Sequence, residues 1–239
     1  MAKAGGVGVT AILSALEPSS AAALAGQLRR VKFTRRQSIY CQGDSADRLY
    51  IITAGKVKLT RRTSNQREKL LAVLGPSDIF GELALLERKP RTSNAIALTD
   101  VWAESLDRSD LQMWLAGPHA IADHLLRLLS ERLRQSNDSL SELTYIDVPG
   151  RVARALLRLA DRFGEARRDG LRVRHDLTQE EIAQLVGASR EAVNRALTDF
   201  TSRGWIRADG KSVLIRQPAR LARRAHLPLK RQTTASTPR

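Results

Sequence analysis

The sequence predicts an α+β protein made of an antiparallel β-roll, one long helix and a compact helical domain that ends in a β-hairpin. Short β-rich runs broken by turn residues extend from Val31 to Asp107. Apolar residues then recur at helical spacing from Leu126 to Leu143. The C-terminal part contains two short amphipathic helices joined at a glycine, followed by two strands around an Asp-Gly pair. We expect domains at 1–117, 118–147 and 148–222, with a basic, disordered tail at 223–239.

The first part begins with SSAAALAGQL, which favours a Ser-capped helix packed against the first strand. A secretory signal is the alternative, but its basic region would be thin. The β-rich runs that follow are RLYIIT, KVKLT, EKLLAVL, SNAIAL and VWAESL. The segment FGELALL between them is apolar and strand-like, and the helical pattern starts near Ser109.

The long helix carries an apolar seam. Spacings of three and four alternate along it, with Ser136 where one more leucine would fall, through Leu126, Leu129, Leu133, Leu140 and Leu143. This pattern is typical of a dimerising coiled coil with one polar interruption. The alternative is a helix that lies only on its own roll. DVPG should end the seam, so we place a hinge at residues 145–150.

Charge is distributed unevenly along the 239 residues, which carry a net charge of +15. Residues 1–147 contain 20 basic and 16 acidic side chains, whereas residues 148–239 contain 20 and 9, a net charge of +11. A polyanion such as double-stranded DNA is the expected partner of the C-terminal part. A solvated basic surface is the alternative.

The number and spacing of cysteine and histidine residues exclude several classes of protein and of site. The single Cys41 rules out an internal disulfide and a four-cysteine iron–sulfur cluster, and it fits a reducing compartment. No apolar run reaches the ~18 residues of a membrane span, so we expect a cytoplasmic protein without a membrane partner. No His/Asp cluster has metal-ligand spacing, which speaks against a metal cofactor and against an enzyme such as a phosphodiesterase.

The segment LTQEEIAQLVGASREAVNRAL is the most specific motif. Thr178 and Glu181 form a capping box, Gly187 allows a tight turn, and Ser189 caps a second helix. The polar face of that helix offers side chains able to read bases in a major groove, namely Arg190, Glu191, Asn194 and Arg195.

The segment WIRADGKSVLIR predicts the wing of a winged helix-turn-helix. Lys211 lies on this wing, and we expect it to contact phosphate. Thr178, Gln179 and Ser189 complete the predicted DNA-binding set. Any helical hairpin could give similar apolar spacing, but it would not also supply the cap, the turn glycine and the wing.

The stretch FGELALLERKPRTSNA suggests a ligand pocket. Glu82 follows Gly81 directly, and Arg91 and Thr92 bring a guanidinium and a hydroxyl together. A molecule that carries both hydroxyls and a phosphate would need these groups, because a guanidinium pairs with two phosphate oxygens and glycine permits close backbone approach. The alternative is an ion pair between Glu82 and Arg91 within the protein.

These motifs resemble the CRP/FNR family, most closely its actinobacterial cyclic AMP receptor proteins. The resemblance covers residues 12–221 and is most specific in GDSADRLYIITAGKVKL, FGELALL with PRTSNA, YIDVPGRVARALLRLA and LTQEEIAQLVGASREAVNRAL. It implies a cyclic-nucleotide-binding β-roll, a dimerising helix and a winged helix-turn-helix that regulates transcription. Cyclic AMP is then the allosteric ligand, and RNA polymerase is an expected partner at the nucleoid.

The resemblance also implies residue roles. Glu82 should accept from the ribose 2′-hydroxyl, and Arg91 with Thr92 should bind the cyclic phosphate, while Gly81, Leu83 and Ala84 belong to the same segment. Ser136 and Asn137 match the pair that contacts the purine, one of them from across the dimer. The family has Thr-Ser or Thr-Asn there, and an amide at Asn137 can serve adenine or guanine. The choice between cyclic AMP and cyclic GMP therefore stays open.

In DNA recognition, the resemblance implies that Arg190, Glu191 and Arg195 read a TGTGA half-site of a palindrome. Haem-sensing relatives use a histidine of the β-roll, and none lies between Val31 and Asp110. Two alternatives remain: a regulator that senses another cyclic nucleotide, and a ligand-independent protein that compacts DNA through its basic C-terminal part.

Overall fold

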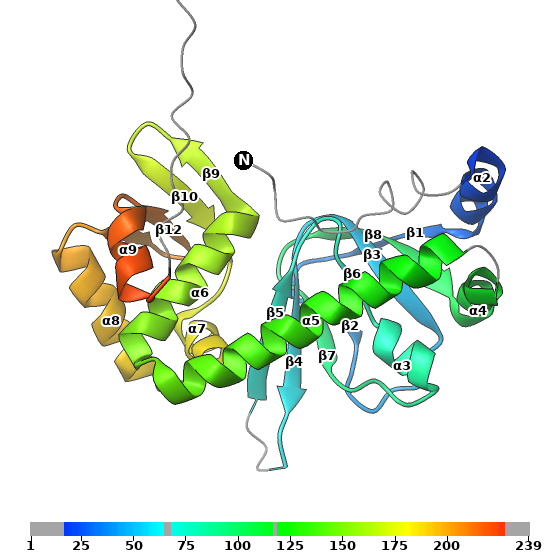
Figure 1. The fold of residues 1–239 in the computed structure, drawn as a ribbon, viewed down its shortest axis with the longest axis horizontal. Helices are drawn as coiled ribbons and strands as arrows, with labels where there is room; N and C mark the ends of the chain where they lie inside the picture. The colour runs from blue at the N-terminus through cyan, green and yellow to red at the C-terminus, as the bar shows by residue number, and fades with distance from the viewer. Residues whose placement is uncertain (1–16, 65–67, 117–118, 228–239) are drawn as a thin grey trace, which may run out of the picture.

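The computed structural model describes residues 17–64, 68–116 and 119–227, arranged as two lobes connected by one long helix (Figure 1). The N-terminal lobe comprises α2 (Pro18–Gln27), β1 (Arg29–Phe33), β2 (Ser38–Tyr40), β3 (Arg48–Ala54), β4 (Val57–Arg62), β5 (Glu68–Leu74), β6 (Ile79–Phe80), α3 (Glu82–Glu87), β7 (Asn94–Ala97), β8 (Val101–Asp107) and α4 (Arg108–Ala116). The long helix α5 is His119–Tyr145. The C-terminal lobe comprises α6 (Val148–Phe163), β9 (Gly164–Arg167), β10 (Gly170–Arg174), α7 (Gln179–Val186), α8 (Arg190–Ser202), β11 (Ile206–Asp209), β12 (Ser212–Ile215) and α9 (Pro218–Arg224).

The N-terminal strands form two four-stranded sheets, ordered β1-β8-β3-β6 and β2-β7-β4-β5. Every pairing is antiparallel, which confirms the predicted β-roll. Fully buried side chains fill the space between the sheets, among them Ile52, Val57, Phe80 and Val101. This burial supplies most of the lobe's stability, because apolar area is removed from water.

Two predictions for this lobe were wrong. FGELALL is not a strand: pairing stops after Ile79–Phe80, and Gly81 turns the chain into helix α3. The N-terminal helix is not Ser-capped, because its N-cap is Glu17 without a side-chain bond and Pro18 begins the helix. Proline is well suited to that first position, where its missing N–H has no helical partner. The helix does pack, with Leu24 buried against the roll.

Helix α5 runs along the β-roll and reaches the C-terminal lobe (Figure 1). Leu125 and Leu128 are buried against the roll and α4, whereas another side of the helix is apolar and exposed. Four of the five leucines of the predicted seam are exposed, namely Leu126, Leu133, Leu140 and Leu143, whereas Leu129 is partly buried. Helix α5 therefore has two apolar faces, and the described part of the chain covers only one of them.

The predicted hinge is shorter than the sequence suggested. Helix α5 ends at Tyr145, and only Ile146 and Asp147 separate it from α6. Pro149 and Gly150 lie in the first turn of α6, and the side chain of Asp147 caps this helix by accepting from the Gly150 N–H at 3.0 Å. Proline is accommodated there for the same reason as in α2.

The C-terminal lobe packs α6, α7, α8 and α9 against a four-stranded sheet ordered β11-β12-β10-β9. The predicted wing is confirmed as β11 and β12 with Gly210 at positive φ. The hairpin β9–β10 was missed, because its two short, polar strands contain a single β-branched residue, Val173, and such residues are the ones that indicate a strand. Arg223 and Arg224, which we had assigned to the tail, belong to α9, and residues 228–239 of that tail lie outside the described residues.

One hydrophobic cluster extends across both lobes. Leu70, Val73 and Leu98 of the roll join the core of the C-terminal lobe. Two ion pairs flank this contact, Lys56 to Asp176 at 2.6 Å and Lys58 to Glu181 at 2.8 Å. None of the helices within the described residues is both long and apolar enough to cross a membrane.

Candidate nucleotide pocket and DNA-reading surface

Gly81 is required by the geometry of the predicted pocket segment. Its φ of +83° lies in the left-handed region, and a Cβ at this position would lie 2.6 Å from Nη1 of Arg91. Nη1 of Arg91 also donates to the Gly81 carbonyl at 2.6 Å. Glycine is therefore required both for this backbone conformation and for the close approach of the guanidinium.

Arg91 is a buried cation, with 3 % of its surface exposed. Its Nη2 donates to the Arg48 carbonyl at 2.6 Å, and its guanidinium carbon lies 4.3 Å from the centre of the Tyr40 ring. Its carboxylate partner is the exposed Asp47, in a long ion pair with 3.8 Å between Nη2 and Oδ1. The buried Nε has no hydrogen-bond partner within the described part of the chain. A desolvated charge with a free N–H favours an anionic ligand.

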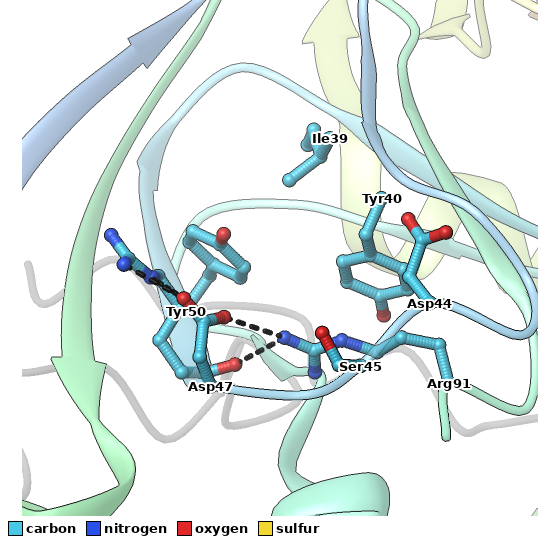
Figure 2. Close-up of a pocket in the computed structure, with 8 residues that line it drawn as sticks. Ile39, Tyr40, Asp44, Ser45, Asp47, Tyr50 and Arg91 are labelled. Atoms are coloured by element: carbon cyan, nitrogen blue, oxygen red, sulfur yellow. Dashed lines mark hydrogen bonds and ion pairs between the residues drawn. The ribbon is translucent and has the colours of Figure 1, made fainter.

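A cavity of about 400 Å³ borders Arg91. Figure 2 shows Tyr40 and Asp47 beside the Arg91 guanidinium in this cavity. Its lining residues are Ile39, Tyr40, Asp44, Ser45, Asp47, Arg48, Tyr50 and Arg91. Burial raises the pKa of Tyr40 to about 12, so its hydroxyl stays protonated and can donate. Of the predicted ligand-binding residues, Arg91 alone is among the residues that line this cavity.

Glu82 begins α3 and is 1 % exposed. Its partner is not Arg91, the alternative that the sequence had left open, but Arg132 of α5. Arg132 also donates to the Ile79 carbonyl, so one guanidinium joins the long helix to the strand and the helix that flank Gly81. Burial raises the pKa of Glu82, and the charge of Arg132 opposes that shift.

Arg132 was not among the predicted site residues, although the prediction for Ser136 could have pointed to it. Residues four apart share one face of a helix, so Arg132 and Ser136 both lie on the same side of α5. Ser136 and Asn137 are exposed. The structure gives neither of them a contact with Arg91. Of the remaining predicted residues, Thr92 and Leu83 are exposed and Ala84 is buried in the roll.

The helix-turn-helix has the predicted local chemistry. The Thr178 hydroxyl accepts from the Glu181 N–H at 3.2 Å, and the Glu181 carboxylate accepts from the Thr178 N–H at 2.7 Å, which confirms the capping box. Ser189 caps α8 by accepting from the Ala192 N–H at 3.2 Å. Gly187 adopts φ +64° between the two helices. The two caps fix where each helix begins, so α8 is held in a defined register.

Helix α8 buries Val193, Ala196, Leu197 and Phe200, and its other side is open to solvent. That exposed side carries Arg190, Glu191, Asn194 and Arg195. The amide of Gln179 donates to the Asn194 carbonyl oxygen at 3.3 Å, which links the two helices at this surface. Hydrogen bonds from its own N–H and the Ser189 hydroxyl lower the pKa of Glu191. Lys211 is partly buried in the turn of the wing.

Two family models match the two lobes. Residues 30–117 match the cyclic nucleotide-binding domain, and residues 150–224 match the Crp-like helix-turn-helix domain. Together with the buried arginine and the exposed face of α8, these matches define a transcription regulator with a cyclic-nucleotide-binding domain and a DNA-binding domain.

Proteins of similar sequence and structure show to which family of transcription regulators the chain belongs. The chain is 56 % identical to the "CRP-like cAMP-activated global transcriptional regulator" of Mycobacterium tuberculosis over 90 % of this chain and 96 % of that one. It is 34 % identical to the "Cyclic AMP receptor protein" of Thermus thermophilus over 81 % and 86 % of the two chains. A solved CRP-family regulator from Thermus thermophilus has a TM-score of 0.71 at 29 % identity, covering 84 % and 98 %. The chain belongs to the CRP/FNR family of transcription regulators.

Proposed function

We propose that this protein is a homodimeric regulator that binds cyclic AMP and then binds a palindromic TGTGA-type site. One observation carries the proposal: the buried Arg91 donates from Nη1 to the Gly81 carbonyl and keeps its Nε–H free of partners, and the next residue, Glu82, is paired with Arg132 of the long helix. A ligand held by Arg91 and Glu82 would therefore act directly on α5, which leads to the DNA-binding lobe.

In the proposed complex, the Arg91 guanidinium gives up its hydrogen bonds to backbone carbonyls and donates to the oxygens of the cyclic phosphate instead. A guanidinium gains more from an anion than from carbonyl groups, because the acceptor then carries a charge as well as the donor. Thr92 adds a hydroxyl donor. Glu82 accepts from the ribose 2′-hydroxyl, and the remaining interaction with Arg132 transmits the change to α5.

The dimer is proposed to form along α5. The exposed leucines of its second apolar face are arranged as the seam of a two-stranded coiled coil. Ser136 and Asn137 lie on the same stretch of α5 and would contact the purine, one of them from the partner chain. A two-fold dimer presents two copies of α8 to successive major grooves, which is why we expect a palindromic site.

Ligand would then act by a population shift. A nucleotide that bridges the roll and the paired α5 helices favours one setting of the Ile146–Asp147 junction, and that setting spaces the two copies of α8 for DNA. Contact with RNA polymerase at the nucleoid of the cytoplasm would follow from DNA binding, and the sign of regulation would depend on where the site lies.

Calorimetric titration with cyclic AMP and with cyclic GMP, repeated in the presence of operator DNA, tests the proposal. We expect cyclic AMP to bind, and operator to raise its affinity. A second candidate ligand class has support, because a solved "c-di-GMP Responsive Global Regulator" from Xanthomonas campestris has a TM-score of 0.70 at 26 % identity. Binding of random DNA that no nucleotide changes would instead favour the ligand-independent DNA-compacting alternative.

Replacing Ser136 tests the role of the seam. Ser136→Leu should complete the leucine register, so that dimers dissociate at a lower protein concentration while cyclic AMP binds more weakly. Analytical ultracentrifugation and nucleotide titration on one sample measure both effects. The matched control is Ser139→Leu, because Ser139 is exposed on the same helix but outside the seam. Weaker association of Ser136→Leu would mean that α5 does not pair as proposed.

Lys211 tests the wing. If its ammonium group neutralises one phosphate, Lys211→Ala should weaken operator and random DNA by the same factor. The slope of log K against log salt should fall by about one per protomer. Fluorescence anisotropy at several salt concentrations measures the slope. An unchanged slope would remove Lys211 from the DNA contact.

A further inference from the structure

Glu142 is a buried acid at the C-terminal end of α5. Only 5 % of its surface is exposed, whereas the leucines on either side of it, Leu140 and Leu143, are 65 % and 43 % exposed. Glutamate is seldom buried to this degree without a cationic partner.

Two arginines of α6 supply the partners. Nη1 of Arg158 lies 2.5 Å from Oε1 of Glu142, and Nη1 of Arg154 lies 3.3 Å from the same oxygen. The arginines are four residues apart and therefore share one face of α6. Both ion pairs cross the junction between α5 and α6, where the connecting chain is only Ile146 and Asp147.

Arg154 also contacts a third helix. Its Nε donates to the Ala225 carbonyl at 2.6 Å and its Nη2 to the His226 carbonyl at 3.4 Å, both just beyond the end of α9. These carbonyls carry the partial negative charge of a helix C-terminus, which a guanidinium stabilises. Helix α9 is itself anchored, since Leu221 and Ala225 are fully buried in the core of the C-terminal lobe.

We propose that Glu142, Arg154 and Arg158 form a clasp that couples nucleotide binding on α5 to DNA binding by the C-terminal lobe. This inference rests on the proposed function and assigns the coupling to named side chains. Glu142 lies roughly 15 Å along α5 from Arg132, which contacts the pocket, and a continuous helix joins them. With a two-residue connection, contacts across the junction decide how α6 follows a movement of α5.

These three side chains are positioning residues, since none of them contacts the proposed ligand or DNA surfaces.

The clasp also gives α9 a function that was not predicted from the sequence. Arg223 and Arg224 were assigned to a basic, disordered tail, but they belong to α9, and the end of this helix is an acceptor for Arg154. Arg224 of the same helix pairs with Asp147, with Nη1 to Oδ1 at 2.8 Å, so it too acts on the junction.

The test is Glu142→Gln, which removes the charge and keeps the shape. The measured quantity is the ratio of operator affinity with and without cyclic AMP, which should be about 5 to 150 in the parent. In the variant this ratio should fall at least threefold. By thermodynamic reciprocity, the factor by which operator raises cyclic AMP affinity should fall equally. Nucleotide affinity without DNA should stay within about twofold, because the pocket is untouched.

Two further variants sharpen the result. Glu131→Gln removes the same charge from an exposed position of α5 and should leave both ratios unchanged. Arg154→Lys keeps one positive charge near Glu142 but loses the fork that reaches α9, since an ammonium group is a point charge without the planar geometry of a guanidinium. If α9 belongs to the clasp, this variant should also lower both ratios.

Three outcomes distinguish the proposed function, the clasp, and the participation of α9 in the clasp. A parent protein whose operator affinity does not respond to cyclic AMP would overturn the proposed function, and the clasp with it. A responsive parent with unchanged ratios in Glu142→Gln would overturn the clasp alone, even if the melting temperature fell, because that result assigns Glu142 to stability only. Lower ratios in Glu142→Gln but not in Arg154→Lys would remove α9 from the clasp.

Discussion

Arg91→Leu should bind cyclic AMP more weakly by about 2 to 4 kcal/mol, roughly 30- to 1,000-fold. The substitution removes a buried guanidinium whose Nε is free and whose other nitrogens already converge on Gly81 and Arg48. A charge-assisted, two-pronged contact to a desolvated phosphate cannot be replaced by an alkyl chain of similar size. Isothermal calorimetry on the purified protein measures the loss directly.

Two further measurements test whether a loss of affinity comes from the pocket rather than from unfolding or from the change in charge. Because Arg91 also ties two backbone carbonyls together, thermal unfolding must show that the variant is folded at the assay temperature. Lys89→Leu is the matched control, since Lys89 is exposed in the same loop and its loss removes one charge without touching the pocket. DNA binding in the absence of nucleotide should change little in either variant. Parent-like affinity of Arg91→Leu for cyclic AMP would mean that the pocket is assigned wrongly.

Local chemistry was predictable from the sequence where neighbouring residues decide it. The capping box of Thr178 and Glu181 depends on residues three apart, and the requirement for glycine at Gly187 follows from a tight turn between two helices. The wing followed from an Asp-Gly pair between two short apolar runs. Each of these features is determined within about ten residues of chain.

Features that depend on distant segments were not predictable in the same way. Arg132 is one of several arginines on α5, and nothing local shows that it pairs with Glu82 on the roll. Glu142 reads as a solvated charge until α6 folds back over it. The error at FGELALL has the same origin, since its apolar pattern suits a strand or a short helix, and the turn at Gly81 decides between them.

We expect specificity for DNA to depend on Glu191, an acidic residue that the negatively charged phosphates do not attract. Glu191 lies in the first turn of α8, exposed beside Arg190, with Arg195 about one turn further along the same helix. Its carboxylate is ionised at neutral pH, as for an ordinary glutamate, and its pKa is lowered further by the hydrogen bonds from its own N–H and the Ser189 hydroxyl, so it is purely a hydrogen-bond acceptor. The amino group of cytosine is the donor that such an acceptor reads in the major groove. Near DNA, the only benefit of this charge is therefore discrimination between bases.

Glu191→Ala should relax the preference at one base pair of each half-site by roughly 5- to 150-fold. Binding to random DNA should stay equal or become tighter, because a negative charge facing the phosphates is lost. Competition binding with a set of operators, each altered at one position, measures the preference, and random duplex measures the background. Lys211→Ala is the natural comparison, since it should weaken every sequence alike. Equal weakening of operator and random DNA by Glu191→Ala would show that helix α8 does not read the bases.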